Sequence, residues 1–466
     1  MTNFQTIHFI GIKGVGMAAL AILAQEMGST VTGSDEANTF VTDEELQKAQ
    51  IPVFEFDVAN LKTKPDLVVV SAAYDKNNIE VKEAHRQHLE IISYSEAVAH
   101  FSKSSKVIAV GGIHGKTTTT AMVSFILSRA NLDPSYLIGA GIVASLGGSA
   151  HHGQGEYFVL EADEYKKSQD DPTPKFLDLS PAIEVITSIE LDHPDMFATE
   201  EEVFKAFYDF ACLLPRNGFI VLCADYAKAR KLANTIADRV FETYGFLPEA
   251  KWQVVDLVEN EEKTSFNIQH DEKIFGPFSL KMPGKGNVLN AAAAAVLALK
   301  LGISETLIKK SLAEFSGIKR RFEIIRKFDE VVLMDDYAHH PRAISLTLEA
   351  IKKKNPKAKI WCIFQPHTYS RTRGLLREFA QAFDLADKVI VTDIYASARE
   401  QDQTITGQEL ALEVRKHQHN VKFIDDWEKI AEEINDNIKK PTVIVTMGAG
   451  DIYKLQDRIY EVLKNG

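Results

Sequence analysis

The sequence is poor in cysteine and has no long apolar run. Its 466 residues include three cysteines, Cys212, Cys223 and Cys362, which lie far apart and form no CxxC pair. This pattern excludes a paired disulfide framework and is typical of a reducing compartment. No window approaches the roughly 18 uninterrupted apolar residues of a membrane span, and no basic segment followed by an apolar stretch indicates a signal peptide. We therefore expect a cytoplasmic protein.

The chain also has fewer positively than negatively charged residues. The chain has 53 Lys and Arg against 65 Asp and Glu, a formal net charge of −12. This balance argues against a general nucleic-acid or membrane binder, so we expect neither as a partner. The hydrophobic content of 45% is ordinary for a globular protein. The length predicts roughly three domains.

A glycine-rich stretch at 107–120 is the most informative motif. An apolar run, expected to be a buried strand, ends at Gly111, and Lys116 and Thr117 begin the next helical segment. Such a loop can cradle phosphates, with Lys116 reaching the β- and γ-phosphates and Thr117 holding Mg²⁺. The loop is one residue shorter than the usual G-x-x-x-x-G-K-[ST]. A glycine turn with a solvated lysine is the alternative, but the order of the elements favours ATP binding.

Strand and helix patterns alternate along three segments. Strands are expected at Thr6–Ile10 and Leu67–Val70 in the first segment, with a helix at 17–27 between them. The second segment has expected strands at 157–160 and 182–186 and an alanine-rich helix at 291–301. The third has expected strands at 331–334, Lys359–Phe364, Lys388–Val391, 421–424 and 442–445. This alternation predicts parallel sheets covered by helices, and places ligands beyond the carboxyl ends of the strands.

A second glycine-rich turn follows the first expected strand. Its sequence, Gly11-Ile-Lys-Gly-Val-Gly16, has the order G-x-x-G-x-G instead of G-x-G-x-x-G. Asp35 ends the next strand, where an acidic residue can meet a ribose hydroxyl. A tight turn without a ligand remains an alternative. Diphosphate binding is favoured, and the ligand need not be NAD.

Two acidic turns follow strands of the second segment. They read Glu161-Ala-Asp-Glu164 and Glu190-Leu-Asp-His193. Carboxylate, imidazole and the Thr117 hydroxyl together predict a magnesium site that bridges ATP phosphates. The alternative is a solvated acidic turn with a surface histidine. The phosphate loop in the same segment favours the metal.

Polar side chains also crowd two strand ends in the third segment. The set is Asp336, Tyr337, His339 and His340 at one end and His367, Arg371 and Arg373 at the other. They could clamp a carboxylate or phosphate, and His367 and Arg371 share a face if that segment is helical. Helix caps and surface charge are the alternative. A role for Arg320 and Arg321 requires a nucleotide lying between domains.

Taken together, these motifs resemble the Mur ligase family of ATP-dependent amide-forming enzymes over essentially the whole chain. The resemblance includes Gly112-Ile-His-Gly-Lys-Thr117, Lys319-Arg-Arg-Phe322, Asp335-Asp-Tyr-Ala-His-His-Pro341, Phe364-Gln-Pro-His367 and Gly448-Ala-Gly-Asp451. These motifs are most similar to the branch that joins L-alanine to the lactyl carboxylate of UDP-N-acetylmuramate in peptidoglycan synthesis. The resemblance implies a reaction that proceeds through an acyl phosphate.

The resemblance implies an α/β fold of three domains, each on a mainly parallel sheet with flanking helices. A Rossmann-like domain at 1–104 would bind the UDP-sugar, a P-loop-like domain at 105–320 would bind ATP, and a Rossmann-like domain at 321–466 would contact the amino acid and nucleotide. The partners would be UDP-N-acetylmuramate and L-alanine, and the protein a monomer or weak homodimer.

The resemblance also assigns site residues. ATP would be held by Gly112, Ile113, His114, Gly115, Lys116, Thr117, Thr118, Asn287, Asn290, Arg321 and Asp336, and Mg²⁺ by Thr117, Glu161 and His193. Substrates would be held by Gly11, Gly14, Gly16, Met17, Asp35, Ser71, His367 and Arg371. The catalytic set would be Lys116, His193, Tyr337, His339 and Arg371.

Some positions depart from the family pattern. Gly286 stands where the family usually has histidine, and Ser188 replaces a common asparagine. Phe207 lies near the position of a carbamylated lysine in sister ligases, which is consistent with the L-alanine-adding branch, since that branch does without this lysine. The polar loop at 166–174 is longer and is similar to that of the murein-recycling ligase, which attaches L-Ala-γ-D-Glu-meso-diaminopimelate. That activity is one alternative. A non-catalytic nucleotide or dinucleotide sensor is another, but it leaves the acidic turns without a task.

Overall fold

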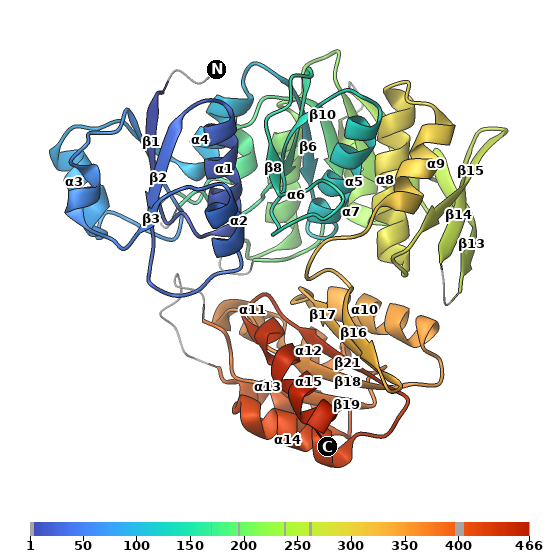
Figure 1. Cartoon of the computed structure of the whole chain (residues 1–466). Helices are drawn as coiled ribbons and strands as arrows, with labels where there is room; N and C mark the ends of the chain where they lie inside the picture. The colour runs from blue at the N-terminus through green and yellow to red at the C-terminus, as the bar shows by residue number, and fades with distance from the viewer. Residues whose placement is uncertain are drawn as a thin grey trace.

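The computed structural model describes residues 4–168, 170–193, 196–236, 239–260, 263–396 and 405–465. Within these ranges three sheets follow one another along the chain. Figure 1 shows the first two sheets and their helices side by side, with the C-terminal part below them. None of the described helices is long and apolar enough to cross a bilayer.

The N-terminal sheet is parallel and has the order β3-β2-β1-β4-β5. Its strands are β1 (Thr6–Ile10), β2 (Thr30–Ser34), β3 (Val53–Phe54), β4 (Leu67–Val70) and β5 (Ile91–Ser93); its helices are α1 (Val15–Glu26), α2 (Asp43–Lys48), α3 (Ile79–Arg86) and α4 (Tyr94–Ser102). The strand order reverses between β1 and β4, which opens a crevice at their carboxyl ends. Gly11 and Ser71 lie at this crevice because they follow these two strands.

The central sheet has the order β15-β14-β13-β12-β11-β10-β6-β9-β7-β8. Its strands are β6 (Lys106–Gly111), β7 (Ser135–Leu137), β8 (Ala150–His151), β9 (Tyr157–Ala162), β10 (Pro181–Ile186), β11 (Phe219–Cys223), β12 (Val240–Gly245), β13 (Trp252–Glu259), β14 (Thr264–His270) and β15 (Lys273–Leu280). The pairs β7–β8, β13–β14 and β14–β15 are antiparallel. The mainly parallel part therefore contains the phosphate loop, which follows β6.

The helices of the central region are α5 (Lys116–Arg129), α6 (Glu200–Ala211), α7 (Ala227–Thr235), α8 (Lys285–Lys300) and α9 (Glu305–Glu314), with a short 3₁₀ helix η2 (Lys175–Asp178). Helix α5 packs against α8. The alanines of α8, Ala291 to Ala295, are fully buried because their small side chains let the two helices approach closely. This contact fixes α8 beside the phosphate loop.

The C-terminal sheet has the order β16-β17-β21-β18-β19-β20. Its strands are β16 (Glu323–Phe328), β17 (Val331–Asp336), β18 (Lys359–Phe364), β19 (Lys388–Val391), β20 (Val421–Phe423) and β21 (Thr442–Met447); its helices are α10 (Pro341–Lys354), α11 (Tyr369–Gly374), α12 (Leu376–Gln381), α13 (Gly407–Val414), α14 (Trp427–Asn437) and α15 (Leu455–Asn465). Only the pairing of β16 with β17 is antiparallel within this sheet as described. Apolar clusters cover both faces.

The predicted fold class is confirmed: three domains, mainly parallel sheets and flanking helices. The predicted start of the alanine-rich helix is wrong. Helix α8 begins at Lys285, and Gly284 caps it with a φ of 96°. Asn287 and Asn290 therefore lie inside the first turns of the helix and not before it. Asp336 ends strand β17 itself instead of following it.

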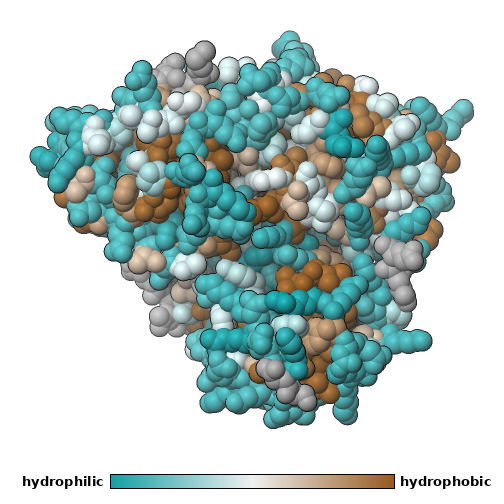
Figure 2. Space-filling model, in the orientation of Figure 1, coloured by the Kyte–Doolittle hydropathy of each residue, from teal (hydrophilic) through white to brown (hydrophobic). Residues whose placement is uncertain are grey.

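Figure 2 shows hydrophilic side chains over most of the visible face. Small groups of hydrophobic residues lie among them, including at the junction between the upper part of the molecule and the C-terminal part. That junction encloses the site described next.

Candidate active site

A cavity of about 520 Å³ lies where the three domains meet. Its lining includes Gly14, Gly16, Met17, Ser71 and Tyr94 from the first domain; Ile113, His114, Gly115, Lys116, Thr117, Thr118, Glu161, Asp163, Glu164, Lys175, Asp192, His193, Asn287 and Asn290 from the second; and Arg321, Asp336, Tyr337, His339 and His340 from the third. The cavity thus joins most of the residues that the sequence analysis singled out.

The phosphate loop needs glycine at two positions. Gly112 has a φ of +129°, and a Cβ there would lie 2.2 Å from the Thr187 hydroxyl oxygen. Gly115 has a φ of +83°, and a Cβ there would lie 2.2 Å from Asn290 Oδ1. These conformations are easy only for glycine. They aim the positive N-terminal end of α5 into the cavity, where an anion is favoured.

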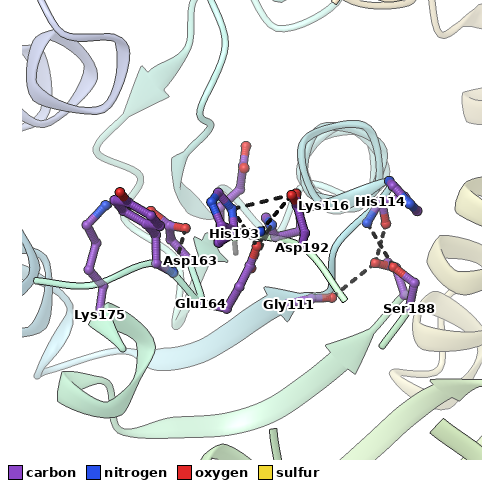
Figure 3. Close-up of polar contacts among 12 residues, drawn as sticks. Gly111, His114, Lys116, Asp163, Glu164, Lys175, Ser188, Asp192 and His193 are labelled. Atoms are coloured by element: carbon purple, nitrogen blue, oxygen red, sulfur yellow. Dashed lines mark hydrogen bonds and ion pairs between the residues drawn. The ribbon is translucent and has the colours of Figure 1, made fainter. Parts of the chain in front are cut away.

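Thr187 and Ser188, which directly follow β10, fix the phosphate loop through hydrogen bonds. The Thr187 hydroxyl donates to the His114 carbonyl (2.5 Å), and Ser188 Oγ accepts from the His114 N–H (2.8 Å). Figure 3 shows His114 and Ser188 beside Gly111 at the strand end. Ser188, which departs from the family pattern, therefore supports the loop through its own hydroxyl.

Lys116 forms a buried ion pair with Glu164. Its ammonium lies 2.7 and 2.9 Å from the two carboxylate oxygens, and Glu164 is 1% exposed. Burial raises the pKa of Glu164, but the Lys116 charge and the contact with His193 together outweigh it, and the pKa is lowered. Figure 3 shows this pair beside His193, whose Nε2 lies 3.5 Å from Glu164. A bound phosphate would therefore share Lys116 with Glu164.

Two of the predicted metal-binding residues lie together. Thr117 Oγ1 donates to Glu161 across 3.2 Å, and the Gly139 N–H donates to the other Glu161 oxygen across 2.6 Å. Burial raises the pKa of Glu161, because the nearby cations compensate it incompletely. An added cation would stabilise this carboxylate. Hydroxyl and carboxylate oxygens are also the donors that Mg²⁺ prefers, so these two residues fit the ion.

His193 lies apart from that pair. It contacts Glu164, and its ring packs against Tyr165 with centroids 4.7 Å apart. In the described part of the chain no group of three or more His, Cys, Asp or Glu is arranged to hold a metal ion. A role of His193 as a metal ligand stays a prediction.

The C-terminal domain contributes Arg321, Asp336 and two histidines to the cavity. Arg321 Nη2 lies 3.5 Å from the Thr117 hydroxyl, and the guanidinium packs on the Tyr337 ring at 4.6 Å. Asp336 accepts the Phe322 and Ala338 N–H groups (2.8 and 2.7 Å), which fixes its carboxylate. The third domain is therefore docked directly on the phosphate loop.

Both cavity histidines of the third domain are held neutral. Burial, and then the charge of Arg371, places the pKa of His339 well below its usual range. Its Nδ1 lies 2.8 Å from the Tyr337 carbonyl, which can only accept, so Nε2 is left as an acceptor. Burial and the neighbouring His114 lower the pKa of His340 to about 4.

Arg371 does not line the cavity. It is 4% exposed, and its Nε lies 2.9 Å from Asp192 in the central domain. Helix α11 begins at Tyr369, so His367 precedes it, yet the two side chains still meet at 3.4 Å. The guanidinium that the sequence analysis assigned to a substrate carboxylate therefore already pairs with a protein carboxylate. Its role toward the amino acid stays a prediction.

Other predicted residues also lie off the cavity lining. They are Gly11, Asp35, Gly112 and His367. Asp35 accepts the Lys13 N–H (2.7 Å) and the Tyr74 hydroxyl (2.9 Å), so it stabilises the first glycine turn. Gly286 does line the cavity, and a Cβ there would meet nothing within 4 Å. The position of the missing histidine is therefore open space.

The sequence analysis missed several residues of the site. Glu164 and Asp192 belong to the two acidic turns, but only Glu161 and His193 were given roles. Lys175 and Tyr94 carried no motif that could have identified them. They enter the cavity only because η2 packs against α4.

Comparison with known proteins gives a consistent result. Three family models match in order: the Mur ligase family catalytic domain at 6–106, the Mur ligase middle domain at 110–298, and the Mur ligase glutamate ligase domain at 320–450. A UDP-N-acetylmuramate–L-alanine ligase of Desulfitobacterium hafniense is 38% identical over 96% of this chain and 98% of its own length. One from Caldanaerobacter subterraneus is 38% identical over 99% and 98%.

Solved structures agree with these relatives. The UDP-N-acetylmuramate–alanine ligase of Thermotoga maritima superposes with a TM-score of 0.83 at 27% identity, covering 99% of each chain. A murein peptide ligase of Psychrobacter arcticus superposes with a TM-score of 0.75 at 26% identity, again over 99% of each. The chain belongs to the Mur ligase family, as the sequence motifs indicated.

Proposed function

We propose that the protein is an ATP-dependent ligase that joins L-alanine to the carboxylate of UDP-N-acetylmuramate, in peptidoglycan biosynthesis. The observation that carries this proposal is that a phosphate loop, buried carboxylates and a second glycine turn meet in one cavity. Relatives of that activity, 38% identical over nearly the whole chain, support the choice of substrates.

The UDP-sugar would bind at the first glycine turn. Val15, Gly16 and Met17 begin α1 and line the cavity. Their N–H groups precede the first intrahelical hydrogen bond, from Ala18 to Gly14, and so remain available to a diphosphate. Ser71 lies across the crevice. The sugar would then extend toward the phosphate loop.

The chemistry consists of two displacements. A carboxylate oxygen of the sugar attacks the γ-phosphorus of ATP, and ADP leaves. The amine of L-alanine then attacks the carbonyl carbon of the acyl phosphate and loses one proton, and hydrogen phosphate leaves with that proton and one former carboxylate oxygen. Lys116 and Arg321 stabilise the negative charge that develops, and closure of the domains around the substrates would keep water from the acyl phosphate.

Thr117 and Glu161 are the residues that would hold Mg²⁺. The ion would neutralise phosphate charge when bound. Glu164 positions Lys116 through the ion pair. Neutral His339 accepts a hydrogen bond from the amine at Nε2 and orients it. Nearby Tyr337, whose ring lies 5.3 Å from that of His339, completes the wall on this side.

The recycling ligase is the closest alternative. The murein peptide ligase of Psychrobacter arcticus shares the fold over the full chain, with the lower of the two TM-scores given above. The two activities use the same sugar and differ in the amine. The choice between them therefore rests on amine preference.

Phosphate release from ATP tests the proposal. The assay contains UDP-N-acetylmuramate and compares L-alanine, glycine, L-serine, the tripeptide and no amine. L-alanine should give the fastest release. Glycine and serine should be poorer but still accepted, because one methylene is worth only about 1–3 kcal/mol in a pocket. Preference for the tripeptide would favour the recycling ligase, and no sugar-dependent release would favour a non-catalytic sensor.

A further inference from the structure

The loop that follows Asp163 returns the chain to the cavity. Lys166 bridges to Pro174, and the Lys167 N–H donates to the Thr173 carbonyl (3.0 Å). At its base the Phe176 N–H donates to the Asp163 carbonyl (3.1 Å). The two ends of the loop, Asp163 and Phe176, are therefore held together, and Lys175 lies at the cavity wall.

Two lysines of this loop have nearly the same chemistry but different positions. Lys175 pairs with Asp163 across 2.6 Å, and Lys167 pairs with Asp178. Their side chains are 12% and 18% exposed. Lys175 lines the cavity and Lys167 does not. Figure 3 shows Lys175 and Asp163 facing one another on the same side as Glu164.

Lys175 lies between the two glycine-rich loops. It begins η2, which packs against α4, and Tyr94 of α4 lines the cavity next to the first turn. A Cβ on Gly16 would lie 2.8 Å from the Tyr94 hydroxyl. On its other side Asp163 leads to Glu164 and Lys116. An anion that extends from the first turn toward the phosphate loop would pass this ammonium.

The first turn has no lysine aimed at the cavity. Lys13 donates to the Glu36 and Asn38 carbonyls (2.9 and 2.8 Å), so its ammonium points away. Among the described residues that line the cavity, the lysines are Lys116 and Lys175. Lys116 belongs to the phosphate loop. An ammonium has three donors, and Asp163 is the hydrogen-bond partner of Lys175 in the described part of the chain.

We propose that Lys175 binds an anionic group of the UDP-sugar, either its diphosphate or its lactyl carboxylate. Asp163 holds the ammonium in place, and the remaining donors meet the substrate. This inference rests on the proposed function, since it takes the UDP-sugar as the ligand. It assigns a binding function to the end of the polar loop at 166–174, the loop that departs from the family pattern.

The test compares Lys175→Met with the matched control Lys167→Met. Calorimetry without ATP gives the Kd of UDP-N-acetylmuramate for each protein. Loss of one charged hydrogen bond should weaken binding by Lys175→Met about tenfold or more. The control should stay within about twofold, because Lys167 does not line the cavity. The KM for ATP should change in neither variant.

Further arms separate the possible results. UDP-N-acetylglucosamine carries the diphosphate but no lactyl carboxylate, so weaker binding of both sugars assigns Lys175 to the diphosphate, and weaker binding of the muramate alone assigns it to the carboxylate. Lys175→Arg should retain most of the affinity, and Lys175→Gln replaces the Met variant if that does not fold. Unchanged muramate binding by Lys175→Met, or equal losses in both lysine variants, would overturn the inference. Absence of muramate binding by the unaltered protein would instead contradict the proposed function.

Discussion

The two glycine-rich loops of this protein occupy equivalent places in their domains but have different surroundings. Each follows a parallel strand and begins a helix, α1 or α5. The first intrahelical bonds run from Ala18 to Gly14 (2.8 Å) and from Thr119 to Gly115 (2.9 Å). In each loop, therefore, the N–H groups of the first turn remain for an anion. The free N–H groups of the first helical turn alone do not distinguish a binding loop from a catalytic one.

The side chains make the difference. Lys13 of the first loop turns outward, and Asp35 is occupied by the loop itself. Lys116 of the second loop points into the cavity, where Glu161 and Glu164 also lie. The first loop can thus hold a diphosphate whose charge does not change. The second has a lysine and buried carboxylates where charge develops during phosphoryl transfer.

Replacing the lysine of each loop should give the largest difference in activity between the two loops. Lys116→Ala should lower kcat about a hundredfold or more, because one lost contact to transition-state charge costs on the order of 3 kcal/mol. Lys13→Ala should leave kcat within about threefold, since Lys13 bonds to the Glu36 and Asn38 carbonyls and does not line the cavity. Steady-state kinetics measure both. Comparable losses in the two variants would mean that the loops share the chemistry.

The acids beside the two loops should differ in their effect on magnesium. Glu161→Ala should raise the Mg²⁺ concentration for half-maximal activity by about 10–100-fold, the scale on which changes around a metal act. Asp35→Asn should leave the Mg²⁺ titration unchanged, because Asp35 bonds to its own loop. Activity as a function of Mg²⁺ concentration checks this pair. An unchanged Mg²⁺ titration for Glu161→Ala would show that this residue has a structural role and does not bind the metal.

Replacing a glycine by alanine should also affect stability differently in the two loops. Gly115→Ala meets Asn290 at 2.2 Å and adopts a φ of +83°, so it should lower stability by about 1–3 kcal/mol and weaken ATP binding. Gly14→Ala has its nearest neighbour at 3.6 Å and should leave stability unchanged within about 0.5 kcal/mol. Denaturant unfolding measures both. Equal stability of the two variants would contradict this geometry.

The smallest expected effect is a pH dependence of stability that comes from His340, which packs against the second loop. His340 packs against His114 with ring centroids 4.8 Å apart, and its pKa is lowered to about 4 from an ordinary value near 6.5. Between these values the unfolded chain binds more protons, so this group's contribution to stability is present above pH 6.5 and is lost as the pH falls toward 4. In the His340→Gln variant, Tm should decrease less between about pH 7 and pH 5 than it does in the unaltered protein. Identical pH profiles would exclude this contribution.

The sequence predicted the fold and the loops well, because strands such as Thr6–Ile10 and Lys359–Phe364 are short apolar runs with clear ends. It missed the antiparallel strands β13 to β15, whose half-exposed pattern carries no motif. Arg371 and Lys175 show a second reason for failure. Their partners, Asp192 and Asp163, depend on how domains and loops pack, and that packing is absent from local spacing. The metal roles of Glu161 and His193 remain predictions.

The proposed reaction has a direct isotopic signature. With isotopically heavy oxygen in the carboxylate of UDP-N-acetylmuramate, the acyl phosphate transfers one labelled oxygen to inorganic phosphate when L-alanine displaces it. Mass spectrometry of the released phosphate should therefore find one heavy oxygen per turnover, and only when ATP and L-alanine are both present. Unlabelled phosphate, or label found in AMP, would contradict the account.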